Sequence, residues 1–494
     1  MKRQRTIAYL AILVAFVLNA FYIKTTHLLL SPDEAYYWDW ARHPSLSYLD
    51  MGPMIAWINM LMVRIMGSTA FALRMGADIF ASLSALLFFE IYNRFFSHAT
   101  ALLATLLYLL NPLVAAGAFI ETYYVPQILF MTALLFLLFE LNETQKPWLW
   151  YPIGFVLGLG ILSHHMFFFF SLEVVLFVVI SARNRHWLWK KEPYLGALIT
   201  VATASPVFIW NLTHGLGMFK RALSLMPAHY NPWFVFTNFF FGDMGLVTPF
   251  VFILLIYVMV YSIRRGLFHH DERFNVILAT SLPTFVFICF LAFRGRAEVN
   301  WPSAGFIAPF IGGVYLLEET YRAGHRKFVF LSFALMFLTM LPVFYFEHYP
   351  SWIYKRLHLP PQNQFTRRLR GWNRLAGQVE GLIQPGEYVG ATDYGITAEL
   401  AFYLKGQPAV YFLKVNDTAK NAYWFFQDRS VLKGKDMIIV DRGNGTLNPV
   451  TRSLFSRVKR LGTFDLTERS SGTPWASFTF YRGYDYRGGT SWTR

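Results

Sequence analysis

A short acidic and aromatic stretch near the N-terminus contains the first residues that could do chemistry. It reads SPDEAYYWDWARHPSLSYLDMGP (residues 31–53) and follows an apolar run directly. Its carboxylates include Asp33, Glu34 and Asp50. A carboxylate walled by aromatic side chains at a membrane edge is partly dehydrated, which raises its pKa toward the range of a general base. The stretch therefore predicts an acid–base site built on these three carboxylates.

The aromatic residues of the same stretch suggest a carbohydrate substrate, because ring faces stack on the apolar C–H surface of sugars. We expect the following side chains to bind substrate: Tyr36, Tyr37, Trp38 and Tyr48. A purely structural interpretation stands beside this one. Ser31, Pro32 and Glu34 form a good helix start, with a Ser N-cap, a Pro at the first helical position and a Glu three residues on. Asp33 would then help to begin a helix, and both interpretations can hold together.

A second polar motif, RGRAEVNWP (residues 294–302), follows an apolar run near the middle of the chain. Arg294 and Arg296 could hold a lipid phosphate through bidentate hydrogen bonds and stabilise charge on a phosphate leaving group. Glu298 and Asn300 would contact the substrate beside them. The alternatives are anchoring at the membrane interface and an internal ion-pair cluster with Glu298.

Two further candidates lie in short turns between apolar runs. Glu121 stands in ETYYVPQ (residues 121–127), and His164 stands in SHH (residues 163–165). We expect both to bind substrate, although Glu121 could equally supply charge at a helix start. The histidine spacing matches no metal signature. Asp50 is a candidate ligand for a divalent metal ion, as an alternative to orienting an acceptor.

Composition indicates that a membrane positions these motifs. The chain has 494 residues, of which 55% are hydrophobic and 15% charged, against about 25% charged residues in soluble domains. Apolar runs of about 20 residues cross a bilayer as helices. We therefore predict an α-helical polytopic membrane protein of about eleven transmembrane helices, over roughly 7–28, 70–92, 99–116, 125–140, 149–162, 166–181, 195–211, 246–263, 276–293, 302–318 and 327–345. The short segment 54–66 is expected to lie on the membrane surface.

Charge gives the predicted helices an orientation. The net charge is +15, and we attribute it to basic cytoplasmic loops rather than to nucleic-acid binding. With MKRQR in the cytoplasm, basic loops such as residues 182–193 and 262–273 fall on the same side. The opening stretch then lies outside the cytoplasm, together with residues 121–127, 163–165, 210–215, 239–245 and 294–302. This convergence of polar motifs on one face predicts a site there.

The composition changes after about residue 345. Prolines cluster at Pro350, Pro360 and Pro361, and charged residues become interspersed. Strand-like segments at 388–392, 409–413 and 435–441 alternate with helix-like segments at 371–383 and 397–404. We predict a transmembrane domain over 1–345, with the first outer loop at 31–69, and a small extra-cytoplasmic α/β domain over 346–494. The single cysteine, Cys289, permits no internal disulfide.

Several motifs in one order resemble the bacterial membrane glycosyltransferases of the dolichyl-phosphate-mannose protein mannosyltransferase superfamily. They are the opening stretch, SPVFIWNLTHG, RGRAEVNWP, RRLRGW, AELAFYLKGQPAVY and GKDMIIV. That superfamily includes the lipid A aminoarabinose transferase and lipopolysaccharide galacturonosyl transferases. The resemblance implies a GT-C fold and a polyprenyl-phosphate-linked sugar as donor. It also implies inversion at the anomeric carbon, with Asp33 as base, Asp50 as second acid, and Arg294 and Arg296 at the donor phosphate.

The sequence departs from the family pattern at several positions. Met51 stands where relatives often have His or Lys, and Gly52 where they have Pro. Thr122-Tyr123-Tyr124 replaces a common Thr-Pro-Asp, so that Glu121 is a candidate to replace the lost acid. His164 stands where relatives often have Lys. These departures bear on the identity of donor and acceptor more than on the reaction class.

We therefore expect an inverting glycosyltransferase in the bacterial inner membrane, with its active site facing the periplasm. The expected partners are a polyprenyl-phosphate sugar donor, membrane lipids and a lipid or glycan acceptor, most simply lipid A or lipopolysaccharide. One alternative is a protein O-glycosyltransferase of the same fold. Another is a lipid-linked-sugar transporter or flippase, but a transporter site should lie near the bilayer midplane, whereas the polar motifs here gather at one face.

Overall fold

The structure of the chain is a computed structural model. It describes residues 2–224, 231–294, 301–344, 365–413, 421–443, 445–467 and 474–488. The chain divides into two compact units. Unit 1 comprises Met1–Thr25, Leu46–Ile58 and Phe71–Phe344, and unit 2 comprises Thr26–Ser45, Asn59–Ala70 and Tyr345–Arg494. The predicted boundary at 345/346 divides the chain at a single point. Unit 2 also contains two segments from near the N-terminus, Thr26–Ser45 and Asn59–Ala70.

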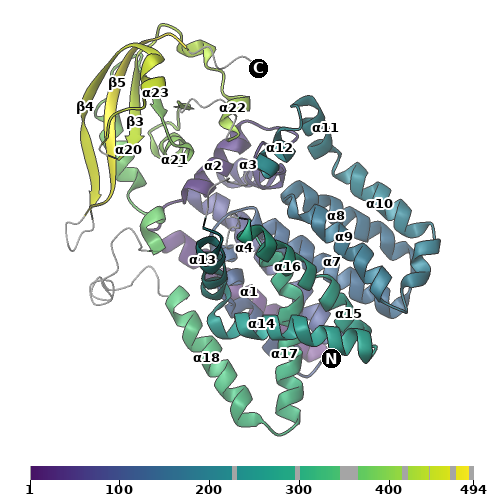
Figure 1. Cartoon of the computed structure of the whole chain (residues 1–494). Helices are drawn as coiled ribbons and strands as arrows, with labels where there is room; N and C mark the ends of the chain where they lie inside the picture. Colours follow the sequence, from purple (N-terminus) through teal and green to yellow (C-terminus); the bar gives the residue numbers. More distant parts are fainter. Residues whose placement is uncertain are drawn as a thin grey trace. The chain divides into compact units, whose positions relative to one another are not determined.

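Unit 1 is built from helices. They are α1 (Lys2–Thr25), α4 (Ala70–Phe95), α5 (Ala101–Leu110), α6 (Pro112–Phe119), α7 (Tyr124–Thr144), η1 (Pro147–Leu149), α8 (Trp150–Ser163), α9 (Met166–Ile180), η2 (Arg185–Trp189), α10 (Glu192–Thr203), α11 (Ser205–Thr213), α12 (Gly217–Ser224), α13 (Pro232–Val247), α14 (Pro249–Ser262), η3 (Ile263–Phe268), α15 (Glu272–Ala279), α16 (Leu282–Phe293), η4 (Ser303–Phe306), α17 (Ile307–Arg322) and α18 (Arg326–Phe344). Helix α3 (Met54–Met66) runs through the division between the units. Helices α7, α8, α9 and α10 pack side by side (Figure 1).

Among the described residues, five helices are long and apolar enough to cross a membrane, or up to seven if each bent pair counts as one span. The predicted number of about eleven stays a prediction, because several apolar helices, α8 and α9 among them, are shorter than this criterion requires. Two predicted spans are each broken. The span at 99–116 becomes α5 and α6, bent by 61°, and the span at 195–211 becomes α10 and α11, bent by 54°. Each second helix has a Pro in its first turn, which cannot donate to the preceding turn.

The helix before the span predicted at 246–263 was not expected from the sequence. Residues 239–245 (FFFGDMG), which we expected outside the cytoplasm, lie inside the helix α13. Asn231 caps this helix by accepting hydrogen bonds from the backbone of Trp233 and Phe234, at 3.0 and 3.3 Å. Asn at an N-cap followed by Pro begins a helix efficiently, and the phenylalanines that follow can continue it in an apolar environment.

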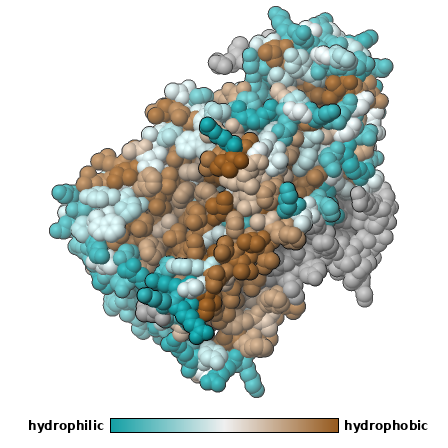
Figure 2. Space-filling model, turned by 180° about the vertical axis from the view of Figure 1, so that it is seen from behind, coloured by the Kyte–Doolittle hydropathy of each residue, from teal (hydrophilic) through white to brown (hydrophobic). Residues whose placement is uncertain are grey.

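Large apolar side chains are exposed on the helices of unit 1, for example Leu18 and Phe21 of α1 and Phe330 of α18. Figure 2 shows a broad apolar area on one face of the molecule, with hydrophilic residues at its edges. A soluble monomer rarely exposes so large an apolar area, and such a surface marks contact with membrane or protein. Together with the apolar helices, it supports a multi-pass membrane protein.

Unit 2 contains a five-stranded sheet with the order β2-β1-β3-β5-β4. Its elements are α2 (Pro32–Arg42), η7 (Phe365–Leu369), α20 (Trp372–Glu380), β1 (Tyr388–Ala391), α21 (Tyr394–Tyr403), β2 (Val410–Phe412), α22 (Tyr423–Phe426), η8 (Ser430–Leu432), β3 (Met437–Arg442), α23 (Pro449–Ser453), β4 (Phe455–Thr467) and β5 (Pro474–Tyr486). Strands β2, β1 and β3 are parallel. Strand β5 pairs antiparallel with both β3 and β4 (Figure 1).

The three parallel strands and the helices α20 and α21 lie where the sequence patterns placed strands and helices. The long strands β4 and β5 were missed. Strand β4 reads FSRVKRLGTFDLT and is mostly exposed or half-buried, so no apolar run identifies it. It is held by pairing with β5, with Phe455 opposite Tyr486 and Leu466 opposite Ala476. Such non-local pairing is invisible to a local pattern.

Candidate active site

Helix α2 carries the carboxylate expected to be the base, and its first turn is held by a complete capping box. The backbone of Ser31 donates to Oε2 of Glu34 at 2.8 Å, and the backbone of Glu34 donates to Oγ of Ser31 at 3.3 Å. Glu34 is fully buried. Its carboxylate therefore has a local structural role as well as the catalytic role expected from the sequence, and the catalytic role stays a prediction.

Asp33 meets a residue that is far away in the sequence. The hydroxyl of Tyr394, the first residue of α21, donates a hydrogen bond to Oδ1 of Asp33 at 2.9 Å. Asp393 fixes the start of α21, because its side chain accepts hydrogen bonds from the backbone of Gly395 and Ile396 at 2.9 and 3.2 Å. Asp33 lies in the first turn of α2, and Tyr394 begins α21. The two helix starts thus meet within unit 2.

The environment of Asp33 raises the pKa of its carboxyl. Burial raises the pKa of the Asp33 carboxyl, and the hydrogen bond from Tyr394 and the charge of Arg368 partly oppose that rise. Burial and the neighbouring Asp33 carboxylate raise the pKa of the Tyr394 hydroxyl, so it stays a hydrogen-bond donor. A carboxylate whose pKa is raised while one oxygen is held by a donor is oriented and more basic than a solvated one.

The aromatic residues that follow Asp33 are packed inside unit 2. Tyr36, Tyr37 and Trp38 are 4%, 5% and 1% exposed. The hydroxyl of Tyr36 accepts a hydrogen bond from the backbone of Ala422 at 2.6 Å, and Nε1 of Trp38 donates to Oγ of Ser68 at 2.8 Å. In this structure the rings therefore anchor α2, and their stacking on a sugar stays a prediction.

Asp50, the second predicted acid, lies in unit 1 and forms an ion pair that the sequence did not suggest. Nε of Arg221, on α12, donates to Oδ1 of Asp50 at 3.0 Å. The backbone of Tyr48 donates to the carbonyl of Met51 at 3.1 Å, which closes the turn that presents Asp50. Tyr48 is 2% exposed, so little of its ring is available to a substrate in this structure.

Gly52 explains one departure from the family pattern. A Cβ added at this position would lie 2.1 Å from the carbonyl oxygen of Leu162, so the turn after Asp50 packs directly on the last residues of α8. His164 caps the C-terminus of that helix. The structure therefore brings the Asp50 turn and the His164 turn together in unit 1.

His164 also contacts the segment that follows Glu121. The His164 ring stacks on the Tyr123 ring with centroids 4.5 Å apart and planes 6° apart. Burial lowers the pKa of His164, and the neighbouring His165 lowers it further, which favours a neutral imidazole. Glu121 is 1% exposed in the turn between α6 and α7. The Asp50 turn, the His164 turn and the Tyr123 segment are thus linked by packing within unit 1.

The arginine-rich motif is described only at its first residue. Arg294 is exposed and caps the C-terminus of α16. Arg296, Glu298 and Asn300 lie outside the described residues, so their expected contacts with a donor phosphate and a substrate stay predictions. Within the described ranges, no three His, Cys, Asp or Glu side chains are grouped so that they could hold a metal ion.

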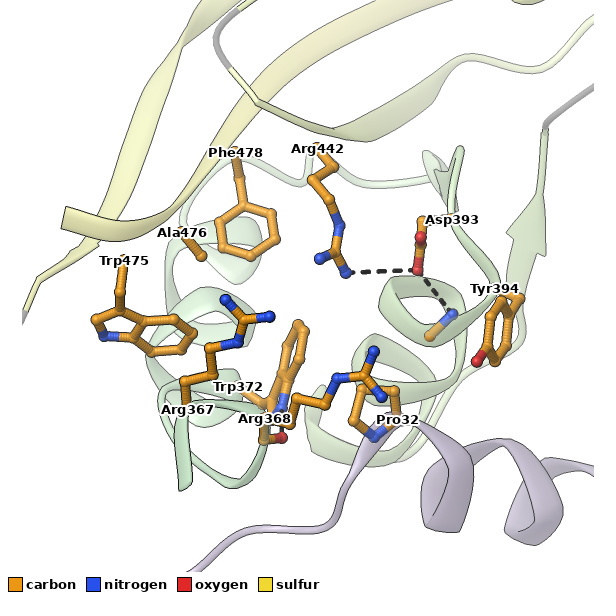
Figure 3. A pocket seen from close by; sticks show the side chains of 11 residues that line it. Pro32, Arg367, Arg368, Trp372, Asp393, Tyr394, Arg442, Trp475, Ala476 and Phe478 are labelled. Atoms are coloured by element: carbon orange, nitrogen blue, oxygen red, sulfur yellow. Dashed lines mark hydrogen bonds and ion pairs between the residues drawn. The ribbon is translucent and has the colours of Figure 1, made fainter. Parts of the chain in front are cut away.

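The sequence analysis missed several residues near Asp33 because they come from the C-terminal part of the chain. Tyr394, Asp393 and Arg442 lie just after β1 or at the end of β3, and Arg367 and Arg368 lie in η7. With Pro32 they line a pocket of about 260 Å³ (Figure 3). The one available signal was the motif RRLRGW, which contains two of these arginines.

Part of the chain is similar in sequence to known proteins. Residues 42–210 match the family described as dolichyl-phosphate-mannose-protein mannosyltransferase. The lipid A galacturonosyltransferase RgtD of Rhizobium johnstonii is 25% identical over 301 residues, which are 60% of this chain and 62% of that protein. The match thus spans less than two thirds of that relative's length.

Solved structures show the same fold over nearly the whole chain. The apo crystal structure of ArnT from Cupriavidus metallidurans has a TM-score of 0.62 at 13% identity, covering 96% of this chain and 98% of that one. ArnT bound to undecaprenyl phosphate gives 0.61 at 13% identity, covering 96% and 97%. An Archaeoglobus fulgidus oligosaccharyltransferase gives 0.51 at 13% identity, covering 96% of this chain and 72% of that one.

The chain therefore has the fold of ArnT. Part of its sequence is similar to the mannosyltransferase family and to a lipid A galacturonosyltransferase. The resemblance seen in the sequence motifs is confirmed.

Proposed function

We propose that this protein is an inverting glycosyltransferase that moves a sugar from a polyprenyl-phosphate donor to lipid A or lipopolysaccharide at the periplasmic face of a bacterial inner membrane. The observation that carries the proposal is the pair formed by Asp33 and Tyr394. The hydrogen bond from Tyr394 holds one oxygen of Asp33, and a complete capping box fixes the start of the helix that carries it. The similarity to RgtD and to ArnT bound to undecaprenyl phosphate supports the choice of acceptor and donor.

In the proposed reaction, the acceptor hydroxyl oxygen forms a bond to the anomeric carbon of the donor sugar. The bond between that carbon and the phosphate oxygen breaks, and its electron pair leaves with the polyprenyl phosphate. Oδ2 of Asp33 takes the hydroxyl proton while the Tyr394 hydroxyl holds Oδ1. Attack opposite to the leaving group inverts the configuration. Arg294 and Arg296 are proposed to stabilise charge on the departing phosphate.

The turns of unit 1 are proposed to contact the substrates. Asp50, held by Arg221, orients the acceptor or holds a divalent metal ion if the reaction uses one. Glu121 and His164 line the same polar region. The sequence match to the mannosyltransferase family covers this region, since it runs from residue 42 to residue 210.

The proposal is tested by comparing envelope lipid A, lipopolysaccharide and glycoproteins by mass spectrometry in three strains. They are wild type, a deletion strain, and one that expresses Asp33→Asn at the wild-type level. The loss of one sugar-sized mass from lipid A or lipopolysaccharide in both mutants is the expected result. Loss from a glycoprotein would instead favour a protein glycosyltransferase. Transfer that persists in the deletion strain would refute the proposal.

A further inference from the structure

The pocket next to Asp33 lies where open α/β sheets bind ligands. Strand β1 lies between β2 and β3. The chain leaves the carboxyl end of β1 through α21 toward β2, and it leaves the carboxyl end of β3 toward the opposite side of the sheet, where β5 and β4 lie. Ligands of α/β sheets bind in the crevice where neighbouring connections diverge in this way. Asp393 follows β1 and Arg442 ends β3, and both line the pocket.

The pocket carries an excess of positive charge. Three guanidinium groups, those of Arg367, Arg368 and Arg442, surround it with one lining carboxylate, Asp393 (Figure 3). Arg442 approaches Asp393 at 3.7 Å. In the part of the chain that the structure describes, Arg367 and Arg368 form no ion pair, and their positive charges remain uncompensated by a contacting carboxylate. Burial, and then the charges of Arg368 and Arg442, lower the pKa of Arg367.

Asp393 neutralises at most one of these three positive charges. Its Oδ1 accepts the backbone hydrogen bonds that begin α21. Three guanidinium cations beside one lining carboxylate leave a net charge of about +2. A phosphate monoester, with a charge of about −1.5 to −2 at neutral pH, would balance it. Guanidinium groups bind phosphate through paired hydrogen bonds, and they do so better than ammonium groups.

The largest uncharged side chains that line the pocket are aromatic. Trp372, Trp475 and Phe478 border the same space (Figure 3). Nε1 of Trp372 donates to the carbonyl of Arg368 at 2.8 Å, which fixes that indole and the adjoining turn. Aromatic walls with a few polar groups are typical of sites for small organic ligands. A volume of about 260 Å³ suits one sugar ring with its phosphate better than a lipid chain.

We propose that this pocket of unit 2, lined by Arg367, Arg368 and Arg442, binds a phosphate monoester carried on a sugar of the acceptor. That the ligand belongs to the acceptor rests on the proposed function. That the ligand is a phosphosugar rests on the lining of the pocket alone. Tyr394 links the two sites, because it lines the pocket and also donates to Asp33. A phosphosugar held there would lie beside Tyr394, the residue that donates to Asp33.

The first test measures binding with the full-length protein in detergent. Glucosamine 1-phosphate, glucosamine and inorganic phosphate are titrated separately by isothermal calorimetry. Glucosamine 1-phosphate should bind and glucosamine should bind at least tenfold more weakly. The double variant Arg367→Gln/Arg442→Gln should lose at least tenfold in affinity for glucosamine 1-phosphate. Equal affinity of wild type and double variant would overturn the proposal.

Controls separate loss of binding from loss of structure. Arg452→Gln removes an exposed arginine of α23 outside the pocket and should bind like wild type. Arg367→Lys/Arg442→Lys keeps the charge and should retain more affinity than the glutamine variant. Each variant must elute as a single species and unfold within a few degrees of wild type. An equal loss of affinity in Arg452→Gln and in the double glutamine variant would show that the pocket is not the binding site.

Kinetics then distinguish the source of the phosphate. The KM for a phosphorylated acceptor should rise at least tenfold in the double glutamine variant, with the donor KM unchanged. A rise in the donor KM alone would assign the pocket to the donor phosphate and overturn the acceptor assignment. The proposed function can fail independently of the pocket. If the wild-type protein binds glucosamine 1-phosphate through these arginines but transfers no sugar, the proposed enzyme activity is wrong and the proposed binding site is still supported.

Discussion

The Tyr394 hydroxyl donates to Oδ1 of Asp33 at 2.9 Å, which joins the first turn of α2 to the first turn of α21 across 361 positions of sequence. Each residue follows its own helix cap, Ser31 for α2 and Asp393 for α21. Two local signals, each readable in the sequence, thus position one hydrogen bond that only the fold creates. The predictions below depend mainly on this contact and on the ion pair of Asp50.

Asp33→Asn should lower kcat by about 10²–10⁴-fold, because a positioned general base typically contributes that much. Stability should be unchanged or slightly higher. Burial raises the folded-state pKa of Asp33, so its ionised form costs stability at neutral pH, and Asn removes the charge while its carbonyl can still accept from Tyr394. Turnover and the unfolding temperature in detergent measure the two effects.

Asp465→Asn is the matched control, because it removes an exposed carboxylate of β4. It should keep wild-type turnover. Wild-type turnover of Asp33→Asn would assign the base to another acid.

Tyr394→Phe should move the acidic limb of the pH–rate profile to higher pH. The hydroxyl stabilises the Asp33 carboxylate and so lowers its pKa. Without it the pKa rises further, and because the ionised form is the active base, the enzyme needs a higher pH to reach the same rate. The profile of kcat/KM against pH measures the shift. An unchanged limb, or one displaced to lower pH, would show that Asp33 does not control the rate.

Gly395→Ala should destabilise the protein by about 1–3 kcal/mol, the range for overpacking a tight contact. A Cβ at residue 395 would lie 2.7 Å from Cβ of Pro32, so α2 or α21 must move. Because that movement separates Asp33 from Tyr394, turnover should fall as well. Thermal unfolding and initial rates report the two effects.

Gly377→Ala in α20 is the contrasting variant. A Cβ there meets nothing within 4 Å, and Ala in a helix interior should add about 0.5–1 kcal/mol relative to Gly. Equal effects of the two alanine substitutions would contradict the close packing of α21 on the start of α2.

Asp50 and Arg221 should act as a unit. Asp50→Asn and Arg221→Gln each break the 3.0 Å contact, so each should lower turnover, and the double variant should lose much less than the product of the two single losses. A double-mutant cycle on kcat/KM measures the coupling. Strictly multiplicative losses would mean that the ion pair does not orient Asp50 for the reaction.

The sequence by itself determined most of the helices and the three parallel strands, and it supplied the candidate site residues. Apolar runs, helix caps such as Ser31–Glu34, and the strands around β1 and β3 are local signals, because hydrogen-bond capping and burial of apolar side chains act over a few residues. The motifs also carried the resemblance to the mannosyltransferase superfamily, and the family match over residues 42–210 agrees with it. Residue type and spacing were therefore enough to propose Asp33, Asp50 and the turns at Glu121 and His164 as candidates.

Only the tertiary structure decided what stands next to these residues. The partners of Asp33 and Asp50, Tyr394 and Arg221, lie 361 and 171 positions away, and no local pattern encodes such pairs. The same holds for β4, which exists through its pairing with β5, and for the arginine pocket, which forms where two strand ends meet. These features depend on contacts between distant segments, so they are defined only when packing brings those segments together.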